Sequence, residues 1–269
     1  MLPYNNLMTT PEITPFNIGL IPAPLSEWFG LPAGHPFAGK VENFPMQSYL
    51  IRVAGRVLLV DAPVYEFPGD DSMLLPEYKG RSIAGLLAEA GVPAEAVTDL
   101  VITHPHLDHT LGLARPVGAP TQGVFPHARH YLGAADWNGT DMEAVERQPF
   151  EVVKAAGLLT LVDGDGELDL GDGLVIVPAP GETPGHQLLW LKTPSVEAYF
   201  VGDLFHHPLE FEYPGLHPVW ANGPLLRTSK AMLAERAAES GAQVYFTHMP
   251  GPYRVVRDGQ TLTWRRIPG

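Results

Sequence analysis

The sequence contains no cysteine among its 269 residues. This absence excludes a disulfide framework, a zinc site built on thiolates and a thiol nucleophile. Any metal bound by this chain must therefore be held by nitrogen and oxygen ligands.

Long apolar runs and basic clusters are also missing. No stretch of eighteen uncharged apolar residues appears, and the N-terminal segment MLPYNNLMTTPEITPF lacks the basic start and apolar run of a secretory signal. The formal net charge is -13, and no cluster of Lys and Arg suggests a basic stripe. We therefore expect a soluble, cytoplasmic protein that binds neither nucleic acid nor membranes and acts on a small molecule.

Gly and Pro, at 28 residues each, are abundant and spread along the chain, which favours many short strands joined by turns. Residues 1–45 are expected to form an arm and loop segment with one strand near Phe16 to Ile21. Residues 46–269 are expected to form the rest of a single domain. The arm would pack either on its own domain or on a second subunit of a homodimer, and the sequence leaves both open.

Several elements are predicted from the spacing of apolar residues. Two β-type runs on either side of Ala54-Gly55 predict a hairpin whose second strand ends at Asp61. Helical spacing predicts helices over 81–90, 142–156 and 225–240. Strands are predicted to dominate the remainder, with the helices on the outside.

Four potential metal ligands fall within six positions of the segment THPHLDH: His104, His106, Asp108 and His109. Imidazole nitrogens and carboxylate oxygens suit zinc and similar divalent ions. The segment directly follows the apolar strand TDLVIT, and loops that leave a buried strand commonly carry functional residues. The sequence therefore predicts a metal site here.

HPHLDH resembles the His-x-His-x-Asp-His signature of the metallo-β-lactamase superfamily. The family's other elements follow in order: the Pro-Gly-His segment PAPGETPGH, the Gly-Asp segment YFVGD and the final histidine in FTHMPG. The resemblance covers about residues 47 to 250. It implies the α/β class, as a four-layer αβ/βα sandwich of two mixed β-sheets with outer helices.

The resemblance also implies a site for two divalent ions, with zinc expected and iron, manganese or cobalt as alternatives. His104, His106 and His186 would bind the first ion. Asp108, His109 and His248 would bind the second, Asp203 would bridge both, and Asp61 would orient the loop. A water shared by two such ions becomes hydroxide near neutral pH, and Asp108 would pass a proton to the leaving group.

Residues beyond the ligands are expected to set the substrate. His206 stands three positions after Asp203, where related lactonases commonly have a tyrosine, and we assign it a catalytic role beside Asp108. The residues expected to line the substrate pocket are Trp28, Trp137, Phe205, His206, His207 and Tyr213.

The predicted function is hydrolysis of an ester-type bond, since the chain resembles the lactonases and the organophosphate and aryl-ester hydrolases of this superfamily. Two alternatives remain at this point. One is a thioester hydrolase of the glyoxalase II type, although the chain ends in strands where that group adds a helical region. The other is a non-hydrolytic metal-binding or redox member of the same fold.

Overall fold

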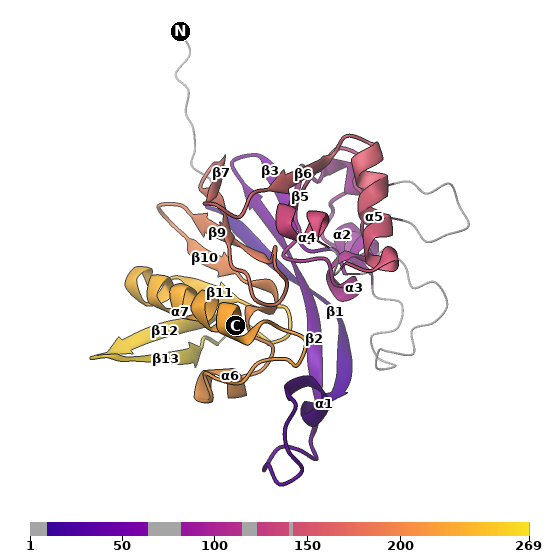
Figure 1. Cartoon of the computed structure of the whole chain (residues 1–269). Coiled ribbons are helices and arrows are strands. Elements are labelled where there is room, and N and C mark those ends of the chain that lie inside the picture. Colours follow the sequence, from indigo (N-terminus) through magenta and orange to yellow (C-terminus); the bar gives the residue numbers. More distant parts are fainter. Residues whose placement is uncertain (1–9, 64–81, 115–122, 140–141, 269) are drawn as a thin grey trace.

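The computed structural model describes residues 10–63, 82–114, 123–139 and 142–268. Over these residues the chain forms two mixed β-sheets, one of six strands and one of seven (Figure 1). The strands of the first sheet are, in spatial order, β1 (Glu12–Pro24), β2 (Val41–Val53), β3 (Arg56–Val60), β4 (Asp99–Val101), β5 (Arg129–Gly133) and β6 (Leu159–Val162). Strands β1 to β3 are antiparallel, and β3 to β6 run parallel.

The second sheet is antiparallel except where β10 and β11 run parallel. Its strands are β7 (Leu168–Gly171), β8 (Leu174–Pro178), β9 (Gln187–Lys192), β10 (Glu197–Phe200), β11 (Gln243–Tyr245), β12 (Tyr253–Asp258) and β13 (Thr261–Arg266), in that spatial order. Long-range crossovers therefore join the parallel pairs in both sheets.

Helices cover the outer face of each sheet, and one apolar core lies between the sheets. Leu58, Val60 and Val101 of the first sheet meet Ile176, Leu189 and Phe200 of the second in that central core. The helices are α1 (Leu25–Phe29), α2 (Ile83–Glu89), α3 (Leu107–Thr110), α4 (Ala134–Asn138), α5 (Ala144–Ala155), α6 (Leu209–Glu212) and α7 (Gly223–Ser240), with 3-10 turns η2 (Ala94–Ala96) and η3 (Gly202–Leu204). The expected four-layer sandwich is confirmed, with α2 and α5 packed on the first sheet and α7 on the second.

The three predicted longer helices are present as α2, α5 and α7, while the expected start of α2 at residue 81 lies outside the described residues. α7 begins where the Asn222 side chain accepts the Leu225 N–H and ends at Gly241 in the left-handed conformation. No helix in the described part of the chain is long and apolar enough to cross a membrane.

The segment before residue 46 contains more strand than the sequence predicts. β1 is thirteen residues long and pairs with β2 along almost its whole length, so the short strand expected near Phe16 extends in both directions. Pro15, Pro22 and Pro24 argue against a strand by composition, but β1 is the edge of its sheet, where proline is tolerated. The β1–β2 ribbon reaches beyond the rest of the sheet and ends in α1 (Figure 1).

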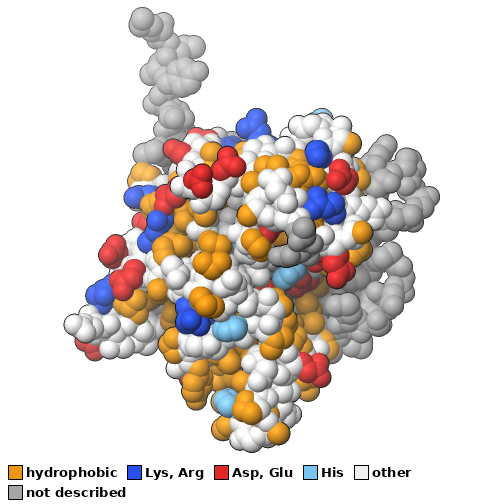
Figure 2. Space-filling view, in the orientation of Figure 1, with side chains coloured by type: hydrophobic (Ala, Val, Ile, Leu, Met, Phe, Trp, Pro, Cys, Tyr) orange, Lys and Arg blue, Asp and Glu red, His pale blue; other side chains and the backbone are white. Residues whose placement is uncertain are grey.

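Charged side chains of both signs are scattered over the face drawn in Figure 2, with apolar side chains between them. Lys and Arg appear there singly or in small groups and do not merge into a stripe. This face offers no extended basic surface among the described residues, as the charge of the sequence leads one to expect.

Candidate metal centre

The predicted ligands lie on loops at the ends of strands from both sheets. His104 follows β4, His106 precedes α3, and α3 itself carries Asp108 and His109. From the second sheet, His186 immediately precedes β9, Asp203 lies in η3 after β10, and His248 follows β11. The centre therefore forms only when the two sheets pack together.

Asp61 organises the loop that bears the first histidines. Its Oδ1 accepts the Thr103 N–H at 2.8 Å, and its Oδ2 lies 2.8 Å from His109 Nδ1. The residue is held at φ 60°, a left-handed conformation that costs free energy in a non-glycine residue. Ser48 stabilises this turn by donating its hydroxyl to the carbonyls of Val60 and Asp61. These contacts are those expected of a residue that orients a ligand histidine.

Gly202 allows Asp203 to approach the histidine loop. Its φ is 52°, and a Cβ there would lie 2.6 Å from the Thr103 side chain. Glycine is therefore required for close packing between η3 and the end of β4.

Asp108, His109 and His248 form one cluster of donor atoms, which we call the Asp108 group. His248 Nε2 lies 3.3 Å from Asp108 Oδ2, and His109 Nε2 lies 3.8 Å from the same oxygen. His248 Nδ1 donates to the Pro45 carbonyl at 2.7 Å, while His109 Nδ1 contacts Asp61. Both rings therefore present Nε2 inward, in a fixed orientation suited to metal binding.

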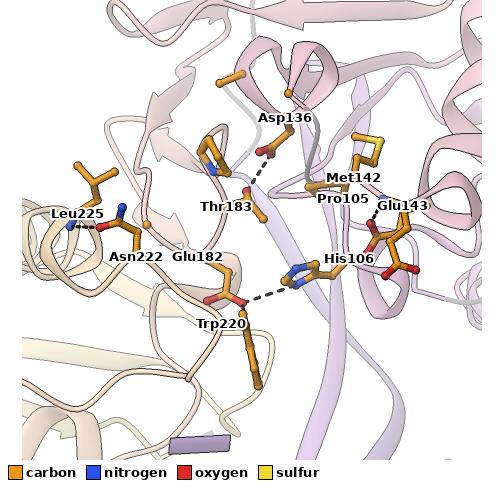
Figure 3. A pocket seen from close by; sticks show the side chains of 15 residues that line it. Pro105, His106, Asp136, Met142, Glu143, Glu182, Thr183, Trp220, Asn222 and Leu225 are labelled. Carbon is orange, nitrogen blue, oxygen red and sulfur yellow. Dashed lines mark hydrogen bonds and ion pairs between the residues drawn. The ribbon is translucent and has the colours of Figure 1, made fainter.

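His104, His106, Glu182 and Asp203 form a second cluster, which we call the Glu182 group. His104 Nε2 lies 2.9 Å from His106 Nδ1 and 3.7 Å from Asp203 Oδ2. Glu182 Oε1 lies 3.6 Å from His106 Nδ1 (Figure 3). Sequence reasoning missed Glu182, because a single Glu in a Gly-Pro turn gives no signal of its own.

Asp203 faces both groups. Its Oδ1 lies 3.3 Å from His109 Nε2, and its Oδ2 lies 3.2 Å from His248 Nε2. Oδ2 also faces His104, as described above. Asp203 therefore contacts donor atoms of both groups.

Glu182 is held in place by its turn and by a tryptophan. Gly181 has φ 146°, and a Cβ on it would lie 2.4 Å from the Leu226 backbone, so only glycine lets the turn rest against α7. The Trp220 indole N–H donates to Glu182 Oε1. The Glu182 side chain is consequently buried, although it is a carboxylate.

His206 lies beside both Asp203 and Glu182. Its Nε2 is 3.2 Å from Asp203 Oδ2 and 3.7 Å from Glu182 Oε1. Glu210 Oε1 accepts the backbone N–H groups of His206 and His207, and Glu210 in turn forms a buried ion pair with Lys230. The ion pair therefore fixes the backbone that carries His206.

His186 is buried next to the Glu182 group, with its ring centroid 5.3 Å from that of His104. Its Nδ1 donates to the Ala179 carbonyl at 3.0 Å, and its Nε2 accepts the Asp203 backbone N–H at 3.3 Å. The His186 ring thus contacts Asp203, and the assignment of His186 as a metal ligand stays a prediction.

The charges of the centre shift the pKa values of its side chains strongly. Burial opposes ionisation of Asp108, but His109 and His248 lower the pKa of this carboxyl to about 2. Burial disfavours the charged form of His248, yet Asp203 and Asp108 raise its pKa to about 9. Burial and the neighbouring His109 and His106 hold the pKa of His104 well below its usual value. A divalent cation would replace the protons that these carboxylates attract.

Several buried polar atoms of the centre have no hydrogen-bond partner in the part of the chain that the structure describes. They are His109 Nε2, Asp203 Oδ1, Glu182 Oε2 and both ring nitrogens of His206. A buried polar group without a partner costs roughly 1–3 kcal/mol, and more when charged. Imidazole and carboxylate donors that converge in this way fit one or two divalent ions.

A cavity of about 440 Å³ opens beside the Glu182 group (Figure 3). His106, Glu182 and Trp220 contribute to its lining, as does Met142 on the side of α5. Trp28 stands next to the centre, with its ring centroid 5.7 Å from those of His206 and His248, and it stacks on Phe44 at 4.0 Å. Of the residues expected at the substrate pocket, Trp28 and His206 therefore adjoin the donor atoms.

The other four residues expected at the pocket lie elsewhere. Phe205 packs with Phe211, Phe246 and Trp264 in the core of the second sheet, and Trp137 packs in the core of the first. His207 contacts Phe29 and Phe44, and Tyr213 contacts His35 near the tip of the β1–β2 ribbon. Packing of irregular segments accounts for these side chains, so we leave them out of the candidate site.

Known proteins resemble this chain in sequence and in structure. N-acyl homoserine lactonase AiiA of Bacillus thuringiensis subsp. kurstaki is 21% identical over 216 residues, which cover 74% of this chain and 80% of that protein. The solved structure of AidC, a dizinc quorum-quenching lactonase in complex with a product, superposes with a TM-score of 0.78 at 17% identity, covering 97% of this chain and 96% of AidC. Hydrolase AbOPH of the beta lactamase superfamily gives a TM-score of 0.77 at 18% identity, with the same two coverages.

The family model of the metallo-beta-lactamase superfamily matches residues 43–248. This range includes every predicted metal ligand, from His104 to His248. The chain belongs to the metallo-β-lactamase superfamily.

Proposed function

We propose that the protein is a dinuclear metal-dependent hydrolase of an ester-type bond, in a lactone, an aryl ester or a phosphotriester. The observation that carries this proposal is the position of Asp203, whose two oxygens face the Asp108 group and the Glu182 group at once. Membership of the superfamily and the likeness to lactonases support it.

The donor set consists of imidazoles and carboxylates, and we propose two zinc ions as its occupants, with iron, manganese and cobalt as alternatives. Ions bound there would polarise the substrate oxygen, activate a water and stabilise the leaving oxygen. His104, His106 and His186 would hold the first ion, Asp108, His109 and His248 the second, and Asp203 both.

Asp108 is assigned a second role, as the group that carries the proton to the leaving oxygen. Its side chain is 25% exposed, whereas those of His109 and Asp203 are 0% and 4% exposed. Of Asp108 and Asp203, Asp108 is therefore the carboxylate that a substrate can reach.

His206 and Trp28 are proposed to orient the substrate. His206 supplies ring nitrogens beside Asp203, and Trp28 supplies an apolar wall above His206 and His248. A polar group and an aromatic wall next to metal donors suit a small ester with an apolar substituent.

The test is to assay the purified protein against lactones, aryl esters, phosphotriesters and thioesters while measuring its metal content. We expect about two ions per chain, hydrolysis of an oxygen ester or phosphotriester, and loss of activity on chelation that metal restores. Hydrolysis by metal-free protein would refute the mechanism. Preference for thioesters would favour the glyoxalase II type, and bound iron without hydrolysis would favour a redox member of the fold.

A further inference from the structure

Four donor atoms at this centre lie within 4.8 Å of one another, and one of them comes from Glu182, which is outside the ligand set that the family signature implies. His104 Nε2 is 2.9 Å from His106 Nδ1, which is 3.6 Å from Glu182 Oε1. Asp203 Oδ2 is 3.7 Å from His104 Nε2. Donors that share one ion at about 2.0–2.2 Å lie at comparable distances from one another.

Glu182 uses only part of its carboxylate for hydrogen bonding within the protein. Its Oε1 accepts the Trp220 N–H, whereas the distance of 3.6 Å from Oε1 to His106 Nδ1 exceeds that of a hydrogen bond. Its Oε2 is buried and has no hydrogen-bond partner among the described residues. This buried oxygen points to a ligand that the protein itself does not provide.

Supporting residues in this protein contact ligand histidines differently. Asp61 and the Pro45 carbonyl each contact a histidine at Nδ1, on the side of the imidazole that faces away from the centre. The Nε2 atom of the same imidazole faces the centre. Glu182 instead faces His106 Nδ1, the same atom that faces His104 Nε2. Glu182 therefore lies on the inner side, among the donors.

We propose that Glu182 is itself a ligand of the ion held by the Glu182 group. The proposal rests on the proposed function, since it requires a metal at this centre. It raises the side-chain ligands of that ion to five: His104, His106, His186, Asp203 and Glu182. Such a set of three imidazoles and two carboxylates suits five or six ligands, as manganese, iron and cobalt accept readily, better than four-coordinate zinc.

Cobalt provides the test, because cobalt(II) absorbs visible light weakly with six ligands and much more strongly with four. We would load the whole protein and the variant Glu182→Gln with cobalt(II), then record the visible spectrum, the metal content and the affinity by competition with a chelator. The wild-type protein should show a weak component that Glu182→Gln converts to stronger absorption, with affinity at one site reduced at least about tenfold.

Two control variants separate ligands from supporting residues. Glu146→Gln lies in the same cavity lining and keeps an oxygen to accept the Glu143 N–H, so its spectrum should match the wild type. Asp61→Asn should weaken binding without producing the spectral change of Glu182→Gln. Circular dichroism and thermal unfolding would establish that each variant is folded.

The outcomes distinguish this inference from the proposed function. If the wild-type protein takes up no metal, both fail. If it takes up two ions but folded Glu182→Gln keeps the wild-type spectrum, only the assignment of Glu182 as a ligand is overturned.

Discussion

The two donor groups of the centre differ in how their side chains are supported. In the Asp108 group, His109 and His248 are each held from behind by a partner on Nδ1, so their inward nitrogens are fixed before any ion arrives. In the Glu182 group, Glu182 Oε1 faces His106 directly, and Glu182 Oε2 has no hydrogen-bond partner among the described residues. The first arrangement is preorganised by the protein, whereas the second depends on an ion to complete it.

Replacing Asp203 should weaken metal binding by the Asp108 group and the Glu182 group at once, and we expect the largest effect from this variant. In Asp203→Ala neither ion retains the carboxylate that faces both groups, so metal content should fall below one ion per chain. Activity should fall by about 10³-fold or more, equivalent to about 4 kcal/mol in the barrier. Metal analysis and kcat/KM measure this. A variant that kept two ions and near-normal activity would show that Asp203 is not shared.

Replacing Glu210 should destabilise only the backbone segment that carries His206. Glu210→Gln keeps an oxygen for the two backbone N–H groups but leaves the Lys230 ammonium buried without its charge partner. We expect a loss of about 3 kcal/mol in the free energy of unfolding at neutral pH. Chemical denaturation measures it, and Glu212→Gln, on the same helix, serves as the control.

The ion pair between Glu210 and Lys230 should make the free energy of unfolding depend on pH. Burial opposes ionisation of Glu210, but contacts with His206 and Lys230 lower its pKa from 4.5 to about 2. A carboxyl with a lowered pKa stabilises the folded protein above its unfolded pKa and loses this contribution as pH falls toward the folded value. The stability difference between wild type and Glu210→Gln should therefore shrink below about pH 4.5. A difference that stayed constant down to pH 3 would contradict the assigned contact.

Asp61→Asn should weaken the Asp108 group alone. The variant removes the carboxylate charge next to His109 Nδ1 while keeping an oxygen for the Thr103 N–H. Replacement of such supporting residues lowers metal affinity about 10- to 100-fold. Chelator competition should show one weakened ion and one unchanged. Equal weakening of both ions would show that the two groups are not independently supported.

Trp220→Phe should have the smallest effect, confined to the Glu182 group. It removes the N–H that donates to Glu182 Oε1 while keeping an aromatic ring at the cavity. Because the side chain is partly exposed, we expect a loss of about 1 kcal/mol, roughly fivefold in the affinity of one ion. Trp190→Phe, at a tryptophan that donates to Glu197 in the second sheet, is the matched control and should leave both affinities unchanged.

The fold and the donor cluster were largely predictable from sequence, because they rest on local spacing. HPHLDH places four donors within six positions of the sequence, and apolar strands before and after it predict a layered α/β fold. β1 was underestimated, since the tolerance of an edge strand for Pro15 and Pro22 depends on its position in the sheet. Glu182 could not be found, because its burial depends on α7 and Trp220, which lie far along the chain.

The residues expected at the substrate pocket also show what could not be predicted from the sequence. Trp28 and Phe205 both lie in irregular stretches of sequence that look alike in composition. Tertiary packing alone determines that Trp28 adjoins His206, whereas Phe205 faces the core of the second sheet. An irregular segment has no periodicity from which the direction of its side chains could be predicted.

Under the proposed function, the β1–β2 ribbon would contribute to the choice of substrate and not to the chemistry. It delivers Trp28 and Phe44 to the wall above the donors, yet it belongs to the edge of the first sheet and supplies no metal ligand that we assign. We therefore expect that residues at its tip can change in size or polarity without altering the assigned metal ligands. For an evolving lineage or a protein engineer, this ribbon is the part of the molecule where new substrates can be explored at the least risk to catalysis.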